Sequence, residues 1–166
     1  QDVNRGVMSL PMILAGLHSR GIDATLHIHG AGDAVDRLRN IEVEGLVITN
    51  SIDHDIIASK LSTYDVGLLP MPGTKVWSLA SPLKRSEYLA SGMVVCGIDH
   101  TGHQIEDSGD WLQLFTQREF ITSTVDWIAN LDRSKLQSLQ KQSRDYAEEN
   151  LSWSHSVDAL ESMILS

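Results

Sequence analysis

The residues best placed for chemistry lie in the stretch SPLKRSEYLASGMVVCGID, which begins at Ser81. Ser81 is a favourable N-cap and Pro82 a favourable first helical residue, so the amides of the next residues, Leu83 and Lys84, would be free to bind an anion. Lys84 and Arg85 add positive charge in the first turn, where a helix usually prefers acidic residues. These residue types favour a phosphate-binding helix terminus.

Glu87 lies one turn further into the same predicted helix. A carboxylate there could accept hydrogen bonds from two neighbouring hydroxyl groups, as in the binding of a ribose. The alternative is that Lys84, Arg85 and Glu87 are solvated surface charges, and the residue types alone favour that alternative. The stretch therefore gives a hypothesis that needs support from other segments.

Other constellations in the sequence are incomplete. GAGDAV begins like a dinucleotide-binding turn, but Val35 stands where the third glycine would be. His27 and His29 share one face of a predicted strand, and His100 and His103 have a possible metal-ligand spacing, yet no cysteine or clear carboxylate completes either set. We therefore predict hydrogen-bonded or solvated histidines. The sequence also lacks the G-x-S-x-G motif of a serine hydrolase.

Asp65 and the tryptophans have structural interpretations. Asp65 stands at the start of a predicted strand and is interpreted as capping the preceding turn, in preference to a catalytic base. Trp77 lies in a long loop, where it could stack on a base or sugar or anchor the loop in the core. Trp111, Trp127 and Trp153 are interpreted as packing residues.

Alternating strands and helices would have to position these residues. We predict strands in ATLHIHG, EGLVIT, YDVGLLP, MVVCGI and WLQLF, the third apolar enough to be buried on both faces. A helix follows Ser9, with Pro11 in its first turn and Gly21 as its stop. Further helices are predicted in AVDRLRN, in IDHDIIASKL with Asp53 as its cap, over residues 82–91, and in three segments from 118 onward.

This alternation predicts an α/β fold, a Rossmann-like parallel sheet with helices on both faces, in one domain spanning residues 1–166. Ligands of such sheets bind beyond the carboxyl ends of the strands. The loops GAGD, ITNS, PMPGTKVWSLAS and DHTG are expected to gather there.

Composition sets outer bounds on function. The 166 residues are 42% hydrophobic and 21% charged, which fits a globular domain with a core. The formal charge of −9 disfavours nucleic acid and anionic membrane surfaces as partners. The single cysteine, Cys96, lies in an apolar run and excludes an internal disulfide. With no membrane-spanning run and no signal peptide, we expect a cytoplasmic protein without direct membrane insertion.

The order of the motifs resembles the donor-binding domain of group 1 nucleotide-sugar glycosyltransferases with the GT-B fold. DVGLLPMP followed by SPLKRSEYLASGMVVCGID is similar to the core of that domain, and NRGVMSLPMILAGL to its basic-glycine opening and first helix. LHIHGAGD, EGLV and LSWSHSVDAL resemble its glycine-x-glycine strand, its base-flanking segment and its terminal segment. The resemblance covers nearly the whole chain.

The resemblance implies donor-binding roles for seven residues. Glu87 would bind the ribose hydroxyls, and the amides of Leu83 and Lys84, behind the cap Ser81, would bind the diphosphate. Arg5 would neutralise the diphosphate. Val47 and Thr49, in the second predicted strand, would line the base pocket. The family works without a metal or other cofactor and retains the anomeric configuration.

Three features depart from the family pattern. Leu79 stands where a glutamate contacts the transferred sugar, and no acidic residue occurs between Asp65 and Glu87. Pro82 replaces the usual glycine at the helix terminus, as in a serine-proline-x-lysine sub-pattern associated with polysaccharide enzymes. The strand that precedes the basic-glycine opening, and the acceptor-binding N-terminal domain, are absent from these 166 residues.

We therefore expect a domain of a retaining glycosyltransferase that binds a nucleotide-diphosphate sugar and is inactive in isolation. The acceptor, a saccharide or a lipid-linked molecule, and any membrane contact would belong to the other domain. The alternative is a non-catalytic domain of the same fold that binds a nucleotide or a protein partner, for which Leu79 would be suitable. An oxidoreductase fragment that binds NAD at GAGD is a third, weaker hypothesis.

Overall fold

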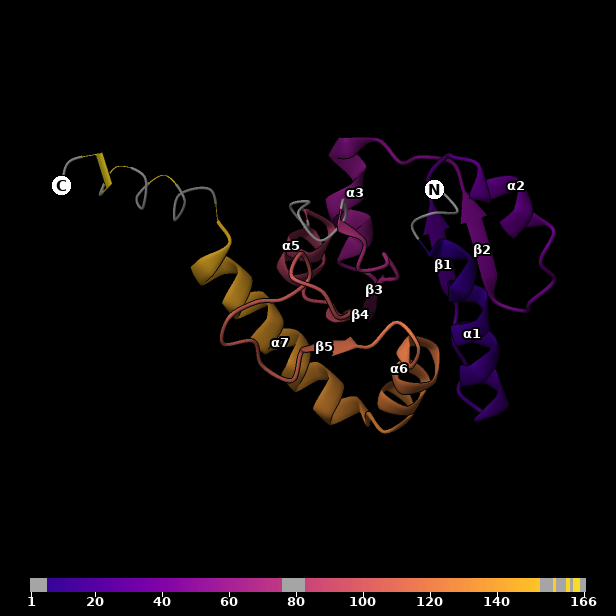
Figure 1. Ribbon diagram of the computed structural model, residues 1–166. Helices are drawn as coiled ribbons and strands as arrows, with labels where there is room; N and C mark the ends of the chain where they lie inside the picture. The colour runs from indigo at the N-terminus through magenta and orange to yellow at the C-terminus, as the bar shows by residue number, and fades with distance from the viewer. Residues whose placement is uncertain (1–5, 76–82, 153–156, 158–160, 162, 165–166) are drawn as a thin grey trace.

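A computed structural model of the chain describes residues 6–75, 83–152, 157, 161 and 163–164, and all statements below concern these residues (Figure 1). Short strands alternate with helices, as predicted. The elements are η2 (Val7–Ser9), α1 (Leu10–Ser19), β1 (Leu26–His29), α2 (Ala34–Arg39), β2 (Leu46–Thr49), α3 (His54–Leu61), β3 (Val66–Leu69), α5 (Leu83–Ala90), β4 (Val94–Ile98), β5 (Leu112–Phe115), α6 (Phe120–Ala129) and α7 (Arg133–Asn150).

Every strand pair is parallel, which confirms the predicted α/β, Rossmann-like fold class. The expectation of one continuous sheet, however, is wrong for the described residues. β1 pairs with β2 in one sheet, and β3, β4 and β5 form a second sheet in that order. No hydrogen bond joins β1 to β3 across the space between them, so the two strands belong to different sheets.

One helical layer, formed by α1 and α6, joins the two sheets. Its hydrophobic cluster combines Leu10 and Ile13 of α1, Ile28 of β1, and Phe120 and Val125 of α6. The helices approach closely at a glycine of α1, where an added Cβ would lie 2.7 Å from a Val125 methyl group. This layer therefore carries the packing that holds the β1–β2 sheet against the β3–β5 sheet.

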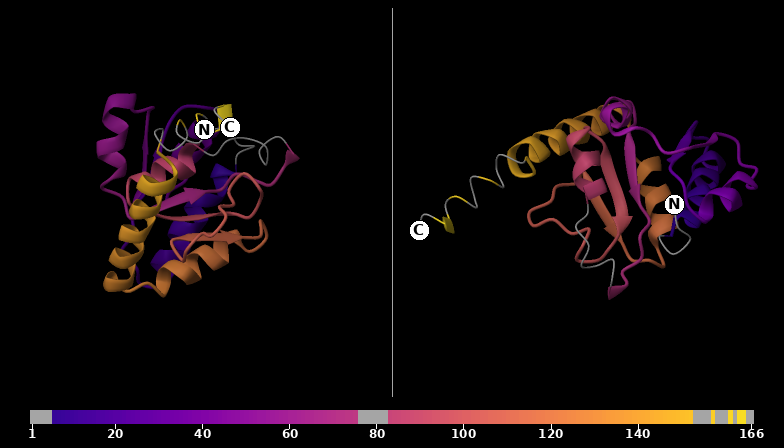
Figure 2. Two further views of the ribbon diagram at one scale, coloured as in Figure 1. Left: turned by 90° about the vertical axis from the view of Figure 1, so that its left-hand side faces the viewer. Right: turned by 90° about the horizontal axis from the view of Figure 1, so that it is seen from above.

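Helices α5 and α7 cover the other face of the β3–β5 sheet (Figure 1, Figure 2). Their cluster includes Leu89 of α5, Leu139 of α7 and the buried Trp111 before β5. At Gly67 of β3 a Cβ would collide with the ring of Tyr88, so this glycine lets α5 lie directly on the strand. β4 is buried along its whole length, as its apolar sequence predicts for a strand covered on both faces.

The loops at the carboxyl ends of the strands meet, as predicted for a parallel sheet. Gly6 lies against Pro70, just after β3, where an added Cβ would collide with the proline carbonyl. In the same region Gly73 faces His100 of the loop after β4, with an added Cβ 3.2 Å from the His100 Cβ. η2 also contacts α2, which follows β1. The carboxyl ends of β1 and β3 therefore lie on the same side of the molecule.

The helix ends agree with the sequence in part. Gly21 adopts φ 74° just after α1, as expected for a stop. Asp53 occupies the N-cap position of α3 but its side chain makes no capping hydrogen bond, whereas Asp132 accepts from the amide of Lys135 at 2.7 Å at the start of α7. The last predicted helix is described only at isolated positions; Val157 is helical there. No described helix is long and apolar enough to cross a membrane.

Candidate functional site

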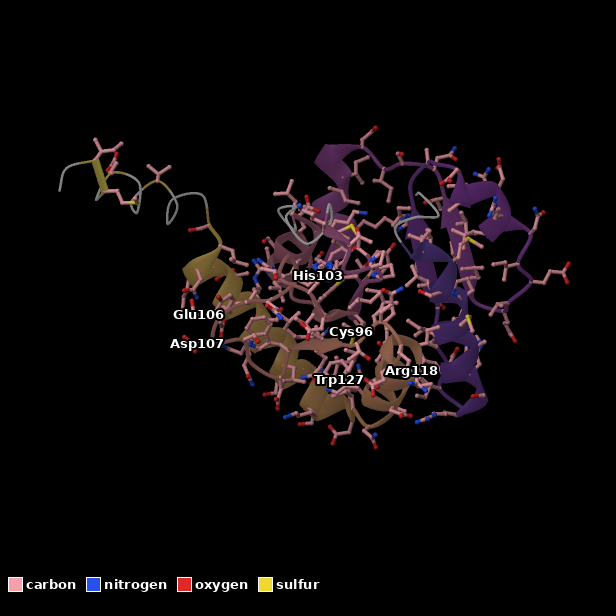
Figure 3. The ribbon with its side chains drawn as sticks, in the orientation of Figure 1. Cys96, His103, Glu106, Asp107, Arg118 and Trp127 are labelled. Atoms are coloured by element: carbon pink, nitrogen blue, oxygen red, sulfur yellow. The ribbon has the colours of Figure 1, made fainter. Side chains whose placement is uncertain are left out.

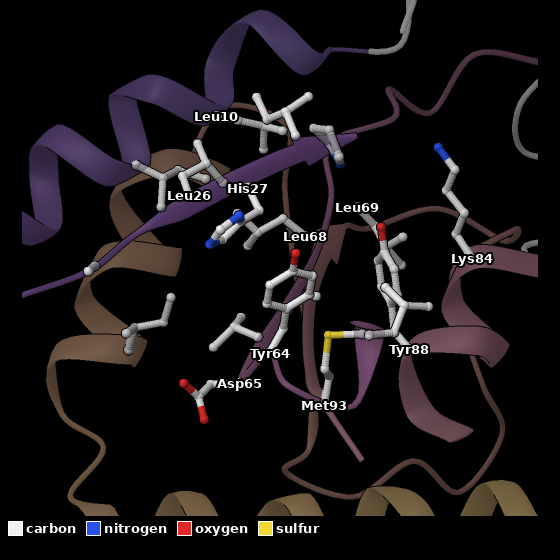
Figure 4. Close-up of a pocket in the computed structure, with 18 of the residues that line it drawn as sticks. Leu10, Leu26, His27, Tyr64, Asp65, Leu68, Leu69, Lys84, Tyr88 and Met93 are labelled. Atoms are coloured by element: carbon white, nitrogen blue, oxygen red, sulfur yellow. The ribbon is translucent and has the colours of Figure 1, made fainter. Parts of the chain in front are cut away.

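A cavity of about 1020 Å³ runs through the space between β1 and β3 (Figure 4). Leu26 and His27 of β1 and Leu68 of β3 face it from the two strands, and α1 and α5 contribute from the two helical layers. Leu10 lines the cavity from α1, and Lys84 lines it from α5. The cavity is apolar on the α1 side and carries charged and aromatic side chains on the α5 side.

Three residues proposed for donor binding line this cavity together: Leu83, Lys84 and Glu87. All three are exposed, and Leu83 keeps 66% of its surface accessible. Because α5 follows β3 through a loop, its first turn lies on the carboxyl side of the sheet, and it contains no acidic residue there. Ser81, the predicted cap, and Pro82 lie outside the described residues.

Arg85 does not point its charge toward a ligand, contrary to the expectation from the sequence. Its Nη1 donates to the carbonyl oxygens of Gln104 at 2.6 Å and Gly102 at 3.4 Å, so the guanidinium fixes α5 to the loop after β4. Partial burial lowers the pKa of Arg85 through desolvation. Both residues of the Lys-Arg pair line the cavity, and Nη1 of Arg85 is committed to these carbonyls.

The base-pocket candidates lie on β2 and do not themselves line the cavity. Val47 is 36% exposed. Thr49 contacts the cavity wall indirectly: its hydroxyl donates to the Asn50 carbonyl at 3.3 Å, and it lies 2.6 Å from Nδ1 of His29, which lines the cavity. The structure therefore does not bring these two residues directly to Glu87. Arg5 lies outside the described residues.

A cluster of rings on β1 links this side of the sheet to the start of β3. Nε2 of His29 lies 2.7 Å from the Tyr64 hydroxyl, and the rings of His27 and Tyr64 stack at 4.8 Å between centroids (Figure 4). Each ring nitrogen of His29 therefore lies within hydrogen-bond distance of a hydroxyl, Nδ1 of Thr49 and Nε2 of Tyr64. Desolvation, followed by the charge of Lys60, lowers the pKa of both histidines, which favours the neutral rings.

Tyr64 is a cavity residue that the sequence did not identify. The only signal was that Tyr64 is the first residue of the predicted strand YDVGLLP. Asp65 itself accepts from Gln140 of α7 at 3.2 Å, so its structural partner is a distant helix and the predicted role in the preceding turn is not seen. Trp111 is buried and Trp127 packs against the same cluster, as predicted, whereas Trp77 and Trp153 lie outside the described residues.

His100 and His103 form a second polar cluster behind the first turn of α5. Their ring centroids are 3.8 Å apart, and Nδ1 of His103 donates to the Ile98 carbonyl at 2.7 Å. Burial lowers the pKa of His103 to about 4. The described residues contain no group of three or more potential metal ligands, so the metal alternative gains no support there. Figure 3 shows His103 and Cys96 inside the molecule, and burial raises the pKa of the Cys96 thiol.

Three buried polar atoms of residues that line the cavity lack a hydrogen-bond partner among the described residues: Nδ1 of His27, Nε2 of His103 and Nε of Arg85. With its Nδ1 donating, neutral His103 offers Nε2 as an acceptor, and Arg85 offers a donor. Buried polar groups are almost always satisfied, so this end of the cavity suits a polar ligand or ordered water.

In chemical terms, the α5 end of the cavity combines a helix N-terminus, a cation and a carboxylate. That set can bind an anion and a hydroxyl-bearing group side by side. No protein-family model matches the chain, and no curated protein matches it.

Proposed function

We propose that this chain is the donor-binding domain of a retaining, metal-independent glycosyltransferase that uses a nucleotide-diphosphate sugar. The observation that carries the proposal is that Leu83, Lys84 and Glu87 line one large cavity at the first turn of α5. The ordered motifs of the sequence support the same function. The acceptor, a saccharide or a lipid-linked molecule, would be bound by a second domain, and a cytoplasmic location is part of the proposal.

The physical basis lies in charge. Cleavage of a sugar–phosphate bond places negative charge on the departing diphosphate. The amides of the first turn of α5 and the ammonium of Lys84 would stabilise that charge. Glu87, one turn further along α5, is placed to accept hydrogen bonds from the ribose of the same nucleotide. No acidic residue in the first turn of α5 opposes the anion.

Nucleotide titration of the isolated domain tests the proposal. We expect UDP, GDP or ADP to shift the backbone amides of Leu83, Lys84 and Glu87 in ¹⁵N-labelled protein. Glu87→Gln removes the charge but keeps the shape of the side chain. Loss of a charge-assisted hydrogen bond costs about 1.5–3 kcal/mol, so the variant should weaken binding by roughly 10- to 100-fold.

The matched control is Glu42→Gln, which neutralises an exposed glutamate outside the residues that line the cavity. It should leave the dissociation constant within about twofold. Lys84→Gln should weaken the binding of nucleotide diphosphates more than that of nucleosides, because the charge of Lys84 acts on the phosphates. Equal affinity in Glu87→Gln and Glu42→Gln, or no amide shift with any of the three nucleotides, would contradict donor binding by α5.

A non-catalytic domain of the same fold is the second candidate. One observation favours it: no carboxylate occurs between Asp65 and Glu87, so the family position that contacts the transferred sugar, Leu79, cannot accept hydrogen bonds. For this function we expect nucleotide diphosphate and nucleotide-sugar to bind with the same affinity, since the sugar would make no polar contact. A tenfold preference for one nucleotide-sugar would favour the enzyme.

A further inference from the structure

Helix α5 is held at its two ends by different kinds of contact. At its carboxyl end Leu89 is fully buried in the cluster shared with α7, and the Ser143 hydroxyl of α7 donates to the Met93 carbonyl at 2.6 Å. At its amino end the first two residues are exposed, and Arg85, the third, is partly buried. Arg85 is therefore placed to fix the first turn of α5 to the rest of the fold.

The carbonyl groups that Arg85 contacts belong to a loop with hydrogen bonds of its own. Nδ1 of His103 donates to the Ile98 carbonyl at 2.7 Å, and Nδ1 of His100 accepts from the Gly102 amide at 3.1 Å. Both rings are at least nine-tenths buried, so these hydrogen bonds are shielded from water. The loop therefore holds its carbonyl groups in a fixed position at the end of β4.

Arg85 reaches this loop through one nitrogen. Its Nη1 donates to the carbonyl oxygens of Gln104 at 2.6 Å and Gly102 at 3.4 Å. A hydrogen bond from a charged donor is stronger than one between two neutral groups. The contact therefore ties the first turn of α5 to a loop that is itself tied to β4.

A polar ligand at the first turn of α5 would depend on this contact. Lys84, next to Arg85, lines the cavity (Figure 4), and so does the fully buried His103, whose Nε2 has no hydrogen-bond partner among the described residues. An anion that binds the amides of Leu83 and Lys84 must meet both N–H groups nearly in line, because hydrogen bonds weaken steeply as the angle falls. A small rotation of the first turn would therefore lower the affinity for the anion.

We propose that Arg85 is a positioning residue for a diphosphate bound at the first turn of α5. Its hydrogen bonds to the loop after β4 hold the amides of Leu83 and Lys84 in the orientation that the anion requires, and it does not touch the phosphates itself. The inference rests on the proposed function and deepens it. Two adjacent cations have separate roles, because Lys84 supplies charge to the ligand and Arg85 supplies geometry.

NMR of the whole chain tests the proposal with Arg85→Met, which removes the hydrogen bonds and keeps an apolar side chain. Without ligand, we expect the ¹⁵N order parameters of the Leu83 and Lys84 amides to fall from about 0.85, typical of rigid backbone, toward about 0.6. The Leu89 amide should stay rigid. Binding of inorganic pyrophosphate should weaken by about tenfold or more, as for the loss of one charge-assisted hydrogen bond to the anion.

Two further variants separate geometry from charge. Arg39→Met removes an exposed arginine of α2 that does not line the cavity, and it should leave pyrophosphate affinity within about twofold because distant charges are screened. Arg85→Lys keeps the charge, but its Nζ lies one bond nearer to the backbone than Nη1 and lacks the planar fork. Its affinity should lie between those of the native chain and Arg85→Met. If Arg85→Met does not fold, Arg85→Gln takes its place.

Native pyrophosphate affinity in Arg85→Met or in Arg85→Lys would overturn the proposal. Weaker binding with unchanged order parameters at Leu83 and Lys84 would do the same, because Arg85 would then contact the anion directly. UDP, GDP and ADP distinguish this from failure of the proposed function. A chain that binds pyrophosphate through Arg85-dependent geometry but gains nothing from a nucleoside contradicts donor binding alone. A chain whose Leu83 and Lys84 amides respond to none of these ligands overturns both.

Discussion

His103 shows how one buried side chain couples this fold to pH. The ring is fully buried, and its single hydrogen bond in the described structure is donated by Nδ1 to the Ile98 carbonyl. Burial lowers its pKa from 6.5 to about 4; the hydrogen bond to the Ile98 carbonyl opposes this shift, and the charges of His100 and Arg85 add to it. The neutral ring is therefore the form that the native state selects.

The stability of the protein should fall between pH 6.5 and pH 4 for this reason. In that range the unfolded chain binds a proton at His103 and the folded chain does not, so unfolding is favoured as the pH decreases. The pKa difference corresponds to about 3 kcal/mol, of which about 2 kcal/mol is lost by pH 5. Urea unfolding at pH 8 and pH 5 measures the effect.

His103→Asn separates this residue from the other histidines. The asparagine amide can donate to the Ile98 carbonyl but does not titrate. We expect the variant to be less stable than the native protein at pH 8 because it loses packing, and to lose about 2 kcal/mol less between pH 8 and pH 5. His27, His29 and His100 have pKa shifts in the same direction and remain in both proteins. Parallel pH curves for the two proteins would contradict the assignment.

Individual cavity residues were predictable where they depend on local periodicity. Lys84 and Glu87 follow from one helical turn after a recognisable cap. Arg85 shows the limit, since the same charge pattern fits a ligand contact or the carbonyls of a loop that lies 17 and 19 residues away. Tyr64 was missed because its contact with His29 spans 35 residues and depends on the relative placement of two sheets.

At the scale of elements, the contact between α1 and α6 is the main connection between the sheets. Gly16 brings the helices together, and Arg20 forms an ion pair with Asp126 at the end of the same interface. The pair is about half exposed and is expected to contribute little. Close packing at Gly16 should therefore dominate the interface.

The effect of Gly16→Ala on stability should change sign with the size of the side chain at residue 125. In the native background the new Cβ lies 2.7 Å from Val125 Cγ2, and overpacking of this kind costs about 1–3 kcal/mol. In a Val125→Ala background the methyl groups are gone, and alanine should stabilise α1 by up to about 1 kcal/mol over glycine. A double-mutant cycle by urea unfolding measures both steps. Destabilisation in both backgrounds would show that the contact is not responsible.

The bounds of the elements followed from the sequence more closely than their pairing. The predicted strands ATLHIHG, EGLVIT, YDVGLLP, MVVCGI and WLQLF each contain one observed strand, because apolar runs and glycine punctuation are local signals. The division into two sheets was not predictable from the same signals. Whether β1 pairs with β3 depends on what lies between them, and the strand sequences do not encode that.

At the scale of the whole molecule, the two sheets should differ in local stability. β4 is buried throughout and paired on both sides, whereas β1 has one strand neighbour and borders the cavity. In native-state hydrogen exchange, the amides of Val95 and Cys96 should exchange only through global unfolding, so their free energy of exchange should equal the global free energy of unfolding. The Ile28 amide, although it faces β2, should exchange through a smaller opening that costs at least about 2 kcal/mol less.

A denaturant series distinguishes the two openings, because the exchange rate of a local opening depends weakly on urea and that of global unfolding depends strongly on it. Equal free energies of exchange for both amides in the unmodified chain would show that the sheets unfold as one unit.

The contact of Gly6 with Pro70 has a consequence for anything joined upstream. Five residues separate Gly6 from the first peptide unit of an attached domain, and a fully extended chain of that length reaches about 17 Å. Such a domain would be tethered near the carboxyl end of β3, at an effective concentration in the millimolar range. Groups contributed by that domain would then meet a ligand on α5 intramolecularly, even where their intrinsic affinity for it is weak.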